Sequence, residues 1–256
     1  MHASWLPDAR VAIRTNGRNL AEFDDPDHPA IEFDIFDPVN TRQTTRSAYV
    51  EARSGAEFAV HVRIYAEFPH HGMGLQVRVS VDGKQVDSCF TTLADMRRDA
   101  EVVVEGTRDE YAGSSYLSKC VFEEHQICKF YLCCCIVGVV WSTGAEFIHI
   151  AEEEALDTDN YADLGTIRVE LRRYRVLDML GDSKHLTPFS PVCLGGIPEK
   201  AMKGRAISSH TALSQRQQTA SVARYSFEYP EGMEPLMTYV FKYRTCSKSA
   251  LLRTQV

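Results

Sequence analysis

The stretch Glu57–Phe68, EFAVHVRIYAEF, decides the fold class of this chain. Its first half places a large apolar side chain at every second position: Phe58, Val60, Val62 and Ile64. Because successive side chains of a β-strand point to opposite faces, this period of two predicts a strand with one buried face.

The same alternation returns in Gly74–Gly83, GLQVRVSVDG, where every second residue is again apolar. The Asp82-Gly83 pair tolerates the positive φ angles of a tight hairpin turn, and Lys84–Cys89 supplies the returning strand. Asn16-Gly17 predicts a second hairpin for the same reason. Two alternating strands joined by a tight turn indicate an antiparallel meander.

Further short segments carry strand signals along the rest of the chain: Val11–Arg14, Ile31–Phe36, Glu101–Glu105, Tyr116–Phe122, Gly165–Val176 and Thr238–Tyr243. There is no βαβ alternation, no glycine-rich phosphate loop and no fixed-period repeat. Many short strands with closely spaced turns are typical of an antiparallel β-sandwich or a jelly-roll-like fold. We therefore expect a mainly β protein.

We expect one β-rich domain over residues 1–256. Glycines, prolines and the polar run at 214–219 predict a largely irregular loop region over 178–221. One or two short helices are expected near the C-terminus, at Pro198–Ala206 and at Ser247–Leu252. Ala151–Asp157 has room for two further helical turns.

The composition is that of a globular protein, with 256 residues, 44% hydrophobic residues and a net charge of −7. An acidic chain is poorly suited to binding that depends on neutralising phosphates, so we do not expect a nucleic-acid partner. Residues 197–256 differ, since they hold nine Lys/Arg against four Glu. This basic tail either complements the acidic body of the same chain or contacts an acidic partner.

No secretory signal opens the sequence, and its longest apolar run, Phe130–Trp141, is shorter than the about 20 residues that cross a bilayer. We therefore expect an intracellular protein without a membrane partner, with nucleus and cytoplasm left open. In a reducing compartment the eight Cys are expected to remain thiols.

No metal site is predicted. His70 and His71 are adjacent, and adjacent side chains on extended backbone point to opposite faces; His61 adds little to them. The densest cysteine cluster joins Cys120 and Cys128 to three consecutive residues, Cys133, Cys134 and Cys135. Structural zinc requires converging pairs of thiolates, so we interpret these cysteines as buried apolar side chains.

No catalytic residue and no cofactor are predicted either. Ser208, Ser209 and His210 are consecutive, whereas a triad is assembled in space. Asp157–Arg168 starts like a calcium loop, but Ala162 occupies the required glycine position and Arg168 that of the bidentate acid. Glu152–Glu154 and the acidic stretch at 22–37 are interpreted as solvated surface. Residues of a ligand-binding site therefore stay unknown.

The strand Tyr239–Arg244 interleaves aromatic and basic residues. It could form a stacking platform for nucleic-acid bases. A core strand with alternating exposure explains the same residues, and we prefer that interpretation.

Seven blocks of the sequence resemble, in the same order, those of an uncharacterised fungal family of unknown function. They are Asn16-Gly17, Tyr49–Ala52, Gly55–Phe58, Val77–Gly83, Leu164–Val169, Pro198–Ala206 and Val240–Thr245. The resemblance spans nearly the whole chain and implies an intracellular, mostly β fungal protein. It implies no activity and carries over no functional residue.

The chain departs from that family pattern at residues 127–150, which are cysteine-rich and apolar. We interpret this segment either as extraneous sequence, such as a translated intron, or as a genuine inserted strand or interaction segment. Peptides from it in a proteome digest would exclude the first interpretation.

Two functions of different classes remain. The first is a non-enzymatic β-sandwich module that binds a protein partner through edge strands and the basic tail. The alternative is a small-ligand-binding protein or an enzyme whose site is built from loops such as 68–74 and 181–197. Carbohydrate binding by Trp5 or Tyr111 has no specific support.

Overall fold

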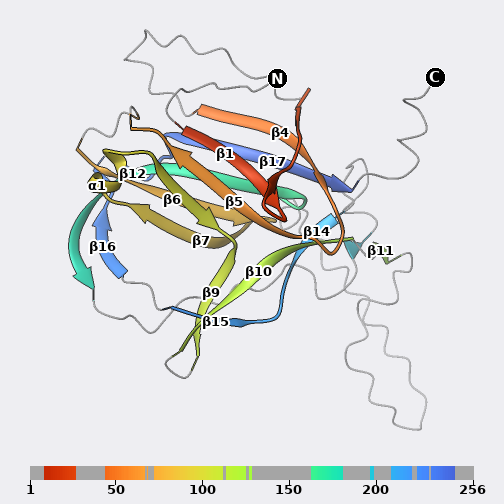
Figure 1. Cartoon of the computed structure of the whole chain (residues 1–256). Helices are drawn as coiled ribbons and strands as arrows, with labels where there is room; N and C mark the ends of the chain where they lie inside the picture. Colours follow the sequence, from red (N-terminus) through yellow and green to blue (C-terminus); the bar gives the residue numbers. More distant parts are fainter. Residues whose placement is uncertain are drawn as a thin grey trace, which may run out of the picture.

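The computed structural model describes residues 9–26, 44–66, 68, 72–111, 114–124, 127–128, 163–180, 197–198, 209–220, 224–230 and 232–245. These residues form two large β-sheets packed face to face, with one short helix (Figure 1). The predicted mainly β sandwich is confirmed.

The first sheet, called sheet I here, has eight strands in the order β14-β10-β5-β1-β2, with β8 paired to β5 and both β9 and β15 paired to β10. Their bounds are β1 Ala9–Thr15, β2 Arg18–Asn19, β5 Glu57–Ile64, β8 Ala100–Val104, β9 Gly106–Tyr111, β10 Ser114–Glu124, β14 Ser209–Leu213 and β15 Gln217–Thr219. In Figure 1 the β9–β10 hairpin and β15 extend below the two packed sheets.

The second sheet, sheet II, has seven strands in the order β3-β4-β17-β12-β6-β7, with β16 paired to β12. Their bounds are β3 Glu22–Asp24, β4 Thr44–Ala52, β6 Gly74–Val81, β7 Lys84–Thr91, β12 Thr166–Leu180, β16 Arg224–Glu228 and β17 Met237–Thr245. β4 and β17 run parallel, so this sheet is mixed where the sequence predicted antiparallel pairing. Strands so far apart in the chain are not constrained by a hairpin turn, which forces antiparallel pairing only between neighbours.

Both predicted hairpin turns are present. Asn16 and Gly17 have φ angles of 49° and 74°, and Asp82 and Gly83 have φ angles of 51° and 77°. Positive φ at both central positions matches the right-handed twist of the flanking strands, which is why these residue types are favoured there.

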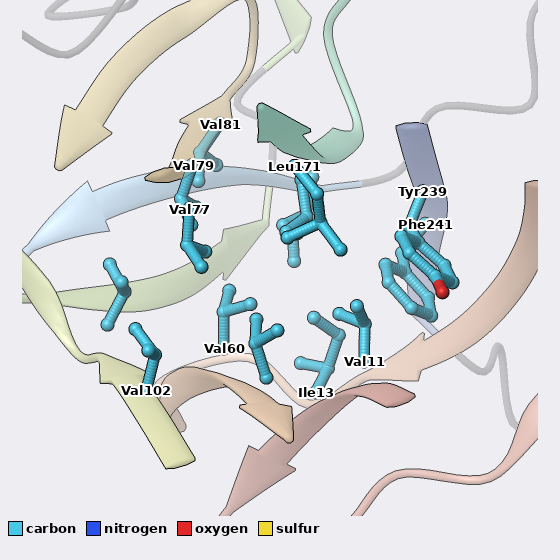
Figure 2. Packing of buried hydrophobic residues seen from close by; sticks show 14 of the residues in the cluster. Val11, Ile13, Val60, Val77, Val79, Val81, Val102, Leu171, Tyr239 and Phe241 are labelled. Atoms are coloured by element: carbon cyan, nitrogen blue, oxygen red, sulfur yellow. The ribbon is translucent and has the colours of Figure 1, made fainter. Parts of the chain in front are cut away.

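The core lies between the two sheets and consists of the alternating apolar residues. Figure 2 shows Val11, Ile13 and Val60 of sheet I facing Val77 and Leu171 of sheet II. All five are at most 2% exposed. The period-two pattern therefore determines which face of each strand is buried.

Strand ends and weakly patterned strands differ from the sequence prediction. β5 ends at Ile64 and not at Phe68, while β7 continues to Thr91. Six strands of the two large sheets were not predicted: β3, β4, β9, β14, β15 and β16. Two of these, β14 and β15, lie within the 178–221 region that was expected to be largely irregular.

The only helix among the described residues is α1, Leu93–Met96, which no sequence pattern predicted. Thr92 and Asp95 form a capping box at its start: each side chain bonds the backbone N–H of the other residue. Predicted helices at Ala151–Asp157 and Ser247–Leu252, and the strand at Ile31–Phe36, lie outside the described residues. Of Pro198–Ala206 only Pro198 is described, in the two-residue strand β13 (Ile197–Pro198), parallel to β11 (Ile127–Cys128).

Gly106 marks the point where β8 passes into β9. β8 pairs with β5, whereas β9 pairs with β10, so the chain changes partner at this residue. A Cβ atom on Gly106 would lie 1.9 Å from the backbone oxygen of Ser118 and 2.6 Å from Cα of Lys119. Only glycine allows the two backbones to come this close.

Candidate functional site

Of the three histidines considered as metal ligands, the structure describes only His61. His61 lies on the outer face of sheet I, with Nδ1 2.8 Å from Arg14 and 3.1 Å from Glu101. His210 lies 3.4 Å from a carboxylate oxygen of Glu123. Within the described ranges, no group of three or more His, Cys, Asp or Glu side chains could hold a metal ion. His70 and His71 lie outside them.

Two cysteines are described with their side chains, and both are sheltered from solvent. Cys120 is 2% exposed and Cys89 is half-buried. Burial raises the pKa of each thiol to about 12, and the charge of Asp82 beside Cys120 and of Asp87 beside Cys89 acts in the same direction. Cys120 thus conforms to the interpretation as a buried apolar side chain, while Cys133–Cys135 lie outside the described residues.

We expect Cys89 and Cys120 to resist alkylation by iodoacetamide at pH 8 in the folded protein, because the reactive thiolate is scarce when the pKa is raised. Peptide mapping by mass spectrometry should find both modified only after denaturation in guanidinium. Rapid labelling of Cys120 in the native protein would contradict its burial in the sandwich.

The basic tail and the acidic N-terminal stretch meet within the described chain. Nζ of Lys242 lies 2.7 Å from a carboxylate oxygen of Asp25, whose side chain is fully buried. In the same tail, Arg216 pairs with Asp109 at 2.7 Å. These pairs favour charge complementarity within the chain over a role of these cations in partner binding.

The interpretation of Tyr239–Arg244 as a core strand is supported. Tyr239, Phe241 and Tyr243 face the core and are 4%, 3% and 1% exposed. The buried rings cannot stack on nucleic-acid bases. The basic residues lie on the other face, where the guanidinium of Arg244 stacks 4.1 Å from the ring centroid of Tyr49.

A buried carboxylate joins the two sheets. Asp82, in the β6–β7 turn of sheet II, accepts hydrogen bonds from the backbone N–H of Gly165 at 2.7 Å and of Thr211 at 2.8 Å. The hydroxyl of Tyr243 lies 2.7 and 2.8 Å from its two oxygens and 3.1 Å from the hydroxyl of Thr211. Thr211 belongs to β14 of sheet I, so these four residues, the Asp82 node, connect the sheets.

The carboxyl group at the centre of the Asp82 node has a perturbed pKa. Burial raises the pKa of Asp82, and the hydrogen bonds from Tyr243, Thr211 and Gly165 oppose this only in part. Asp82 is 5% exposed and its hydrogen-bond partners come from both sheets, so we interpret its raised pKa as that of a structural carboxylate.

The raised pKa of Asp82 predicts a pH dependence of stability. An acid whose pKa is higher in the folded state binds its proton more readily there, so stability falls as pH rises above the usual value of 3.8. Relative to Asp82→Asn, which does not titrate, the wild type should therefore lose unfolding free energy between pH 4 and neutrality. Urea titrations across this pH range measure the unfolding free energies of both proteins. If the difference between them stays constant with pH, the raised pKa of Asp82 is contradicted.

Aromatic side chains gather on the outer face of sheet II. Phe90 of β7 lies 4.6 Å from Phe227 of β16 and 5.0 Å from Tyr174 of β12, measured between ring centroids. Phe227 in turn lies 5.4 Å from Tyr229. Tyr174 is buried, while the other three are half-buried. We call these four residues the aromatic face.

The aromatic face is held by hydrogen bonds to the strands beneath it. The hydroxyl of Tyr229 donates to Oε1 of Gln76 at 2.7 Å, and the amide of Gln76 donates to Ser88 at 2.6 Å. The hydroxyl of Tyr174 donates to the backbone oxygen of Thr91 at 3.2 Å. Fixed rings at a surface form a rigid, partly apolar platform.

Two exposed apolar residues extend this platform along β12. Val176, 47% exposed, is the cross-strand partner of Phe227, and Leu177, 60% exposed, follows it where the β12–β16 register shifts. A contiguous exposed apolar surface on a folded protein marks a place of contact more often than isolated residues do.

A row of polar residues adjoins the aromatic face on the same side of sheet II. Thr238, Glu170, Arg78 and Ser88 lie opposite one another on β17, β12, β6 and β7. Arg172 is the next outward residue of β12 after Glu170, and its guanidinium donates a hydrogen bond to the carboxylate of Glu170 at 2.7 Å. This row and the aromatic face together are the candidate functional site.

Sequence reasoning did not find this site. It used the apolar residues of β6 and β12 to identify the buried face, and it assigned no role to the outward residues between them. The signal was present in Phe90 and Tyr174, which are aromatic at outward positions of alternating strands. Of the loops proposed to build a site, residues 181–196 lie outside the described residues.

In the part of the chain that the structure describes, no helix is both long and apolar enough to cross a membrane.

A family model described as "Domain of unknown function (DUF7918)" matches residues 9–130 and 148–254. The unmatched residues, 131–147, lie inside the 127–150 segment. The interpretation of that segment as extraneous or inserted sequence stays a prediction. No curated protein and no solved structure matches the chain.

Proposed function

The chain belongs to the family described as a domain of unknown function (DUF7918), and we propose that it is a non-enzymatic β-sandwich module that binds another protein through the aromatic face. The observation that carries the proposal is the set of three half-buried rings, Phe90, Phe227 and Tyr229, fixed on the solvent side of sheet II.

A protein partner fits this surface better than other ligands. Aromatic and arginine side chains are enriched among the residues that dominate protein–protein binding energy. Rings held on strands lose little conformational entropy on binding, which favours affinity. The net charge of −7 disfavours nucleic acid, because such binding depends on neutralised phosphates.

The surface also replaces the contact regions expected from sequence. In the tail, Lys242 and Arg216 are already engaged by Asp25 and Asp109. Because these two cations are engaged within the chain, the proposal moves from the basic tail to the aromatic face.

We expect Phe227→Ser to reduce partner binding about tenfold or more, as loss of a central aromatic side chain does in protein interfaces. The tagged full-length chain and its variants would be expressed in the cells that naturally contain the protein. Co-purifying proteins would then be quantified by mass spectrometry.

Tyr111→Ser provides the matched control, because Tyr111 is 67% exposed at the tip of the β9–β10 hairpin, away from the aromatic face. Proteins that the wild type and Tyr111→Ser retain but Phe227→Ser loses would support the proposal, provided that all three chains melt cooperatively. Equal retention by both variants would overturn the chosen surface. Catalytic turnover by the purified chain would count against a non-enzymatic role.

A further inference from the structure

We propose that the candidate functional site recognises an extended protein segment in which an acidic side chain lies two residues from an aromatic or large aliphatic one. This inference rests on the proposed function and adds the chemistry of the partner. The acidic side chain would pair with Arg78 and Arg172, and the apolar one would lie on the aromatic face.

The polar row has more hydrogen-bond donors than acceptors. Among the described residues, Nε of Arg78, Nε of Arg172 and the hydroxyl of Thr238 are shielded from water and have no hydrogen-bond partner. Thr238 and Arg172 are only 4% and 8% exposed. Buried polar groups without partners are rare and unfavourable, so a ligand that supplies an acceptor is favoured here.

The charge of the polar row also favours an acidic ligand. Glu170 is the only carboxylate among Thr238, Glu170, Arg78, Ser88 and Arg172, and it bonds a single nitrogen of Arg172. Two guanidinium groups against one carboxylate leave an excess positive charge. A guanidinium has five N–H donors in a planar fork that matches a carboxylate, so both arginines retain donors for a second acid.

The spacing of the partner's side chains follows from the sheet. Gln76 lies opposite Phe90 and under the hydroxyl of Tyr229, and Arg78 is the next outward residue on the same strand. Outward residues of one strand are about 7 Å apart. An extended partner matches this distance with side chains two residues apart, which gives the motif acidic–any residue–apolar.

The test is a set of synthetic hexapeptides, each with one Glu and one Phe separated by zero to four residues. Each peptide has a counterpart with Gln in place of Glu, and fluorescence polarisation with the full-length chain gives the Kd values. We expect the peptide with a single residue between Glu and Phe to bind best. Its Kd should be at least tenfold lower than that of its Gln counterpart. Arg78→Gln should remove that difference. Arg63→Gln, an equal charge change on sheet I, should preserve it.

Other occupants of the site give distinct results. Tighter binding of poly-uridylate RNA than of the Glu peptide, or a dimer mass in light scattering that Phe227→Ser abolishes, would overturn the inference. So would equal binding of the Glu and Gln peptides. If both peptides bind equally and Phe227→Ser abolishes both, the proposed function stands while the acidic partner is excluded. If acetate alone competes as well as the peptide does, the apolar half of the motif is excluded and the inference fails.

Discussion

Asp82→Ala is expected to lower the free energy of unfolding by about 4 kcal/mol or more, since each buried donor left without an acceptor costs about 1–3 kcal/mol. The donors are the N–H groups of Gly165 and Thr211 and the hydroxyl of Tyr243. Alanine at a φ of 51° adds roughly 1 kcal/mol of backbone strain. Urea denaturation followed by circular dichroism measures the loss.

Two milder variants keep this prediction testable if Asp82→Ala does not fold. Tyr243→Phe removes one donor and keeps the ring, so it should cost about 1–2 kcal/mol. Asp82→Asn tolerates the positive φ and retains one carbonyl oxygen, but its NH₂ group faces the N–H of Thr211, so one hydrogen bond is lost. Its loss of unfolding free energy should therefore lie between the losses of Tyr243→Phe and Asp82→Ala. Losses below about 0.5 kcal/mol for both would show that the Asp82 node does not hold the sheets together.

Gly106→Ala is expected to destabilise the protein by about 3 kcal/mol or more, because overpacking against rigid backbone is relieved only by moving a strand. The added Cβ atom would lie 1.9 Å from the backbone oxygen of Ser118. Hydrogen exchange should show the largest loss of protection in β9 and β10, which pair beside this residue.

Gly17→Ala is the matched control. Gly17 has a φ of +74°, but a Cβ atom added there would have no neighbouring atom within 4 Å. The substitution therefore introduces strain without a clash and should cost about 1 kcal/mol. Equal losses at Gly17 and Gly106 would mean that the close contact of Gly106 with β10 is absent.

The core and both tight turns could be predicted from sequence because they depend on local information. Val77, Val79 and Val81 alternate with polar residues, and Asp82-Gly83 accommodates positive φ without help from the rest of the fold. The parallel pairing of β4 with β17 could not be predicted in this way. Which distant strands become neighbours depends on the whole arrangement of the sheets.

The candidate functional site is the harder case, since its parts come from β6, β7, β12, β16 and β17. Phe90 and Phe227 are far apart in sequence, and β16 was not predicted as a strand, although Tyr225, Phe227 and Tyr229 alternate there with polar residues. The Asp82 node was missed for a related reason: the sequence indicates a turn at Asp82, but not that Tyr243 and Thr211 reach its carboxylate.

The claim that the aromatic face binds a protein can be tested most directly by photocrosslinking. The photoreactive amino acid p-benzoylphenylalanine would replace Phe227 in one chain and Tyr111 in another, both expressed in the cells that naturally contain the protein. We expect irradiation to produce a discrete crosslinked protein from position 227 and none from position 111. Crosslinks from position 111 alone, or identical background from both positions, would contradict the account.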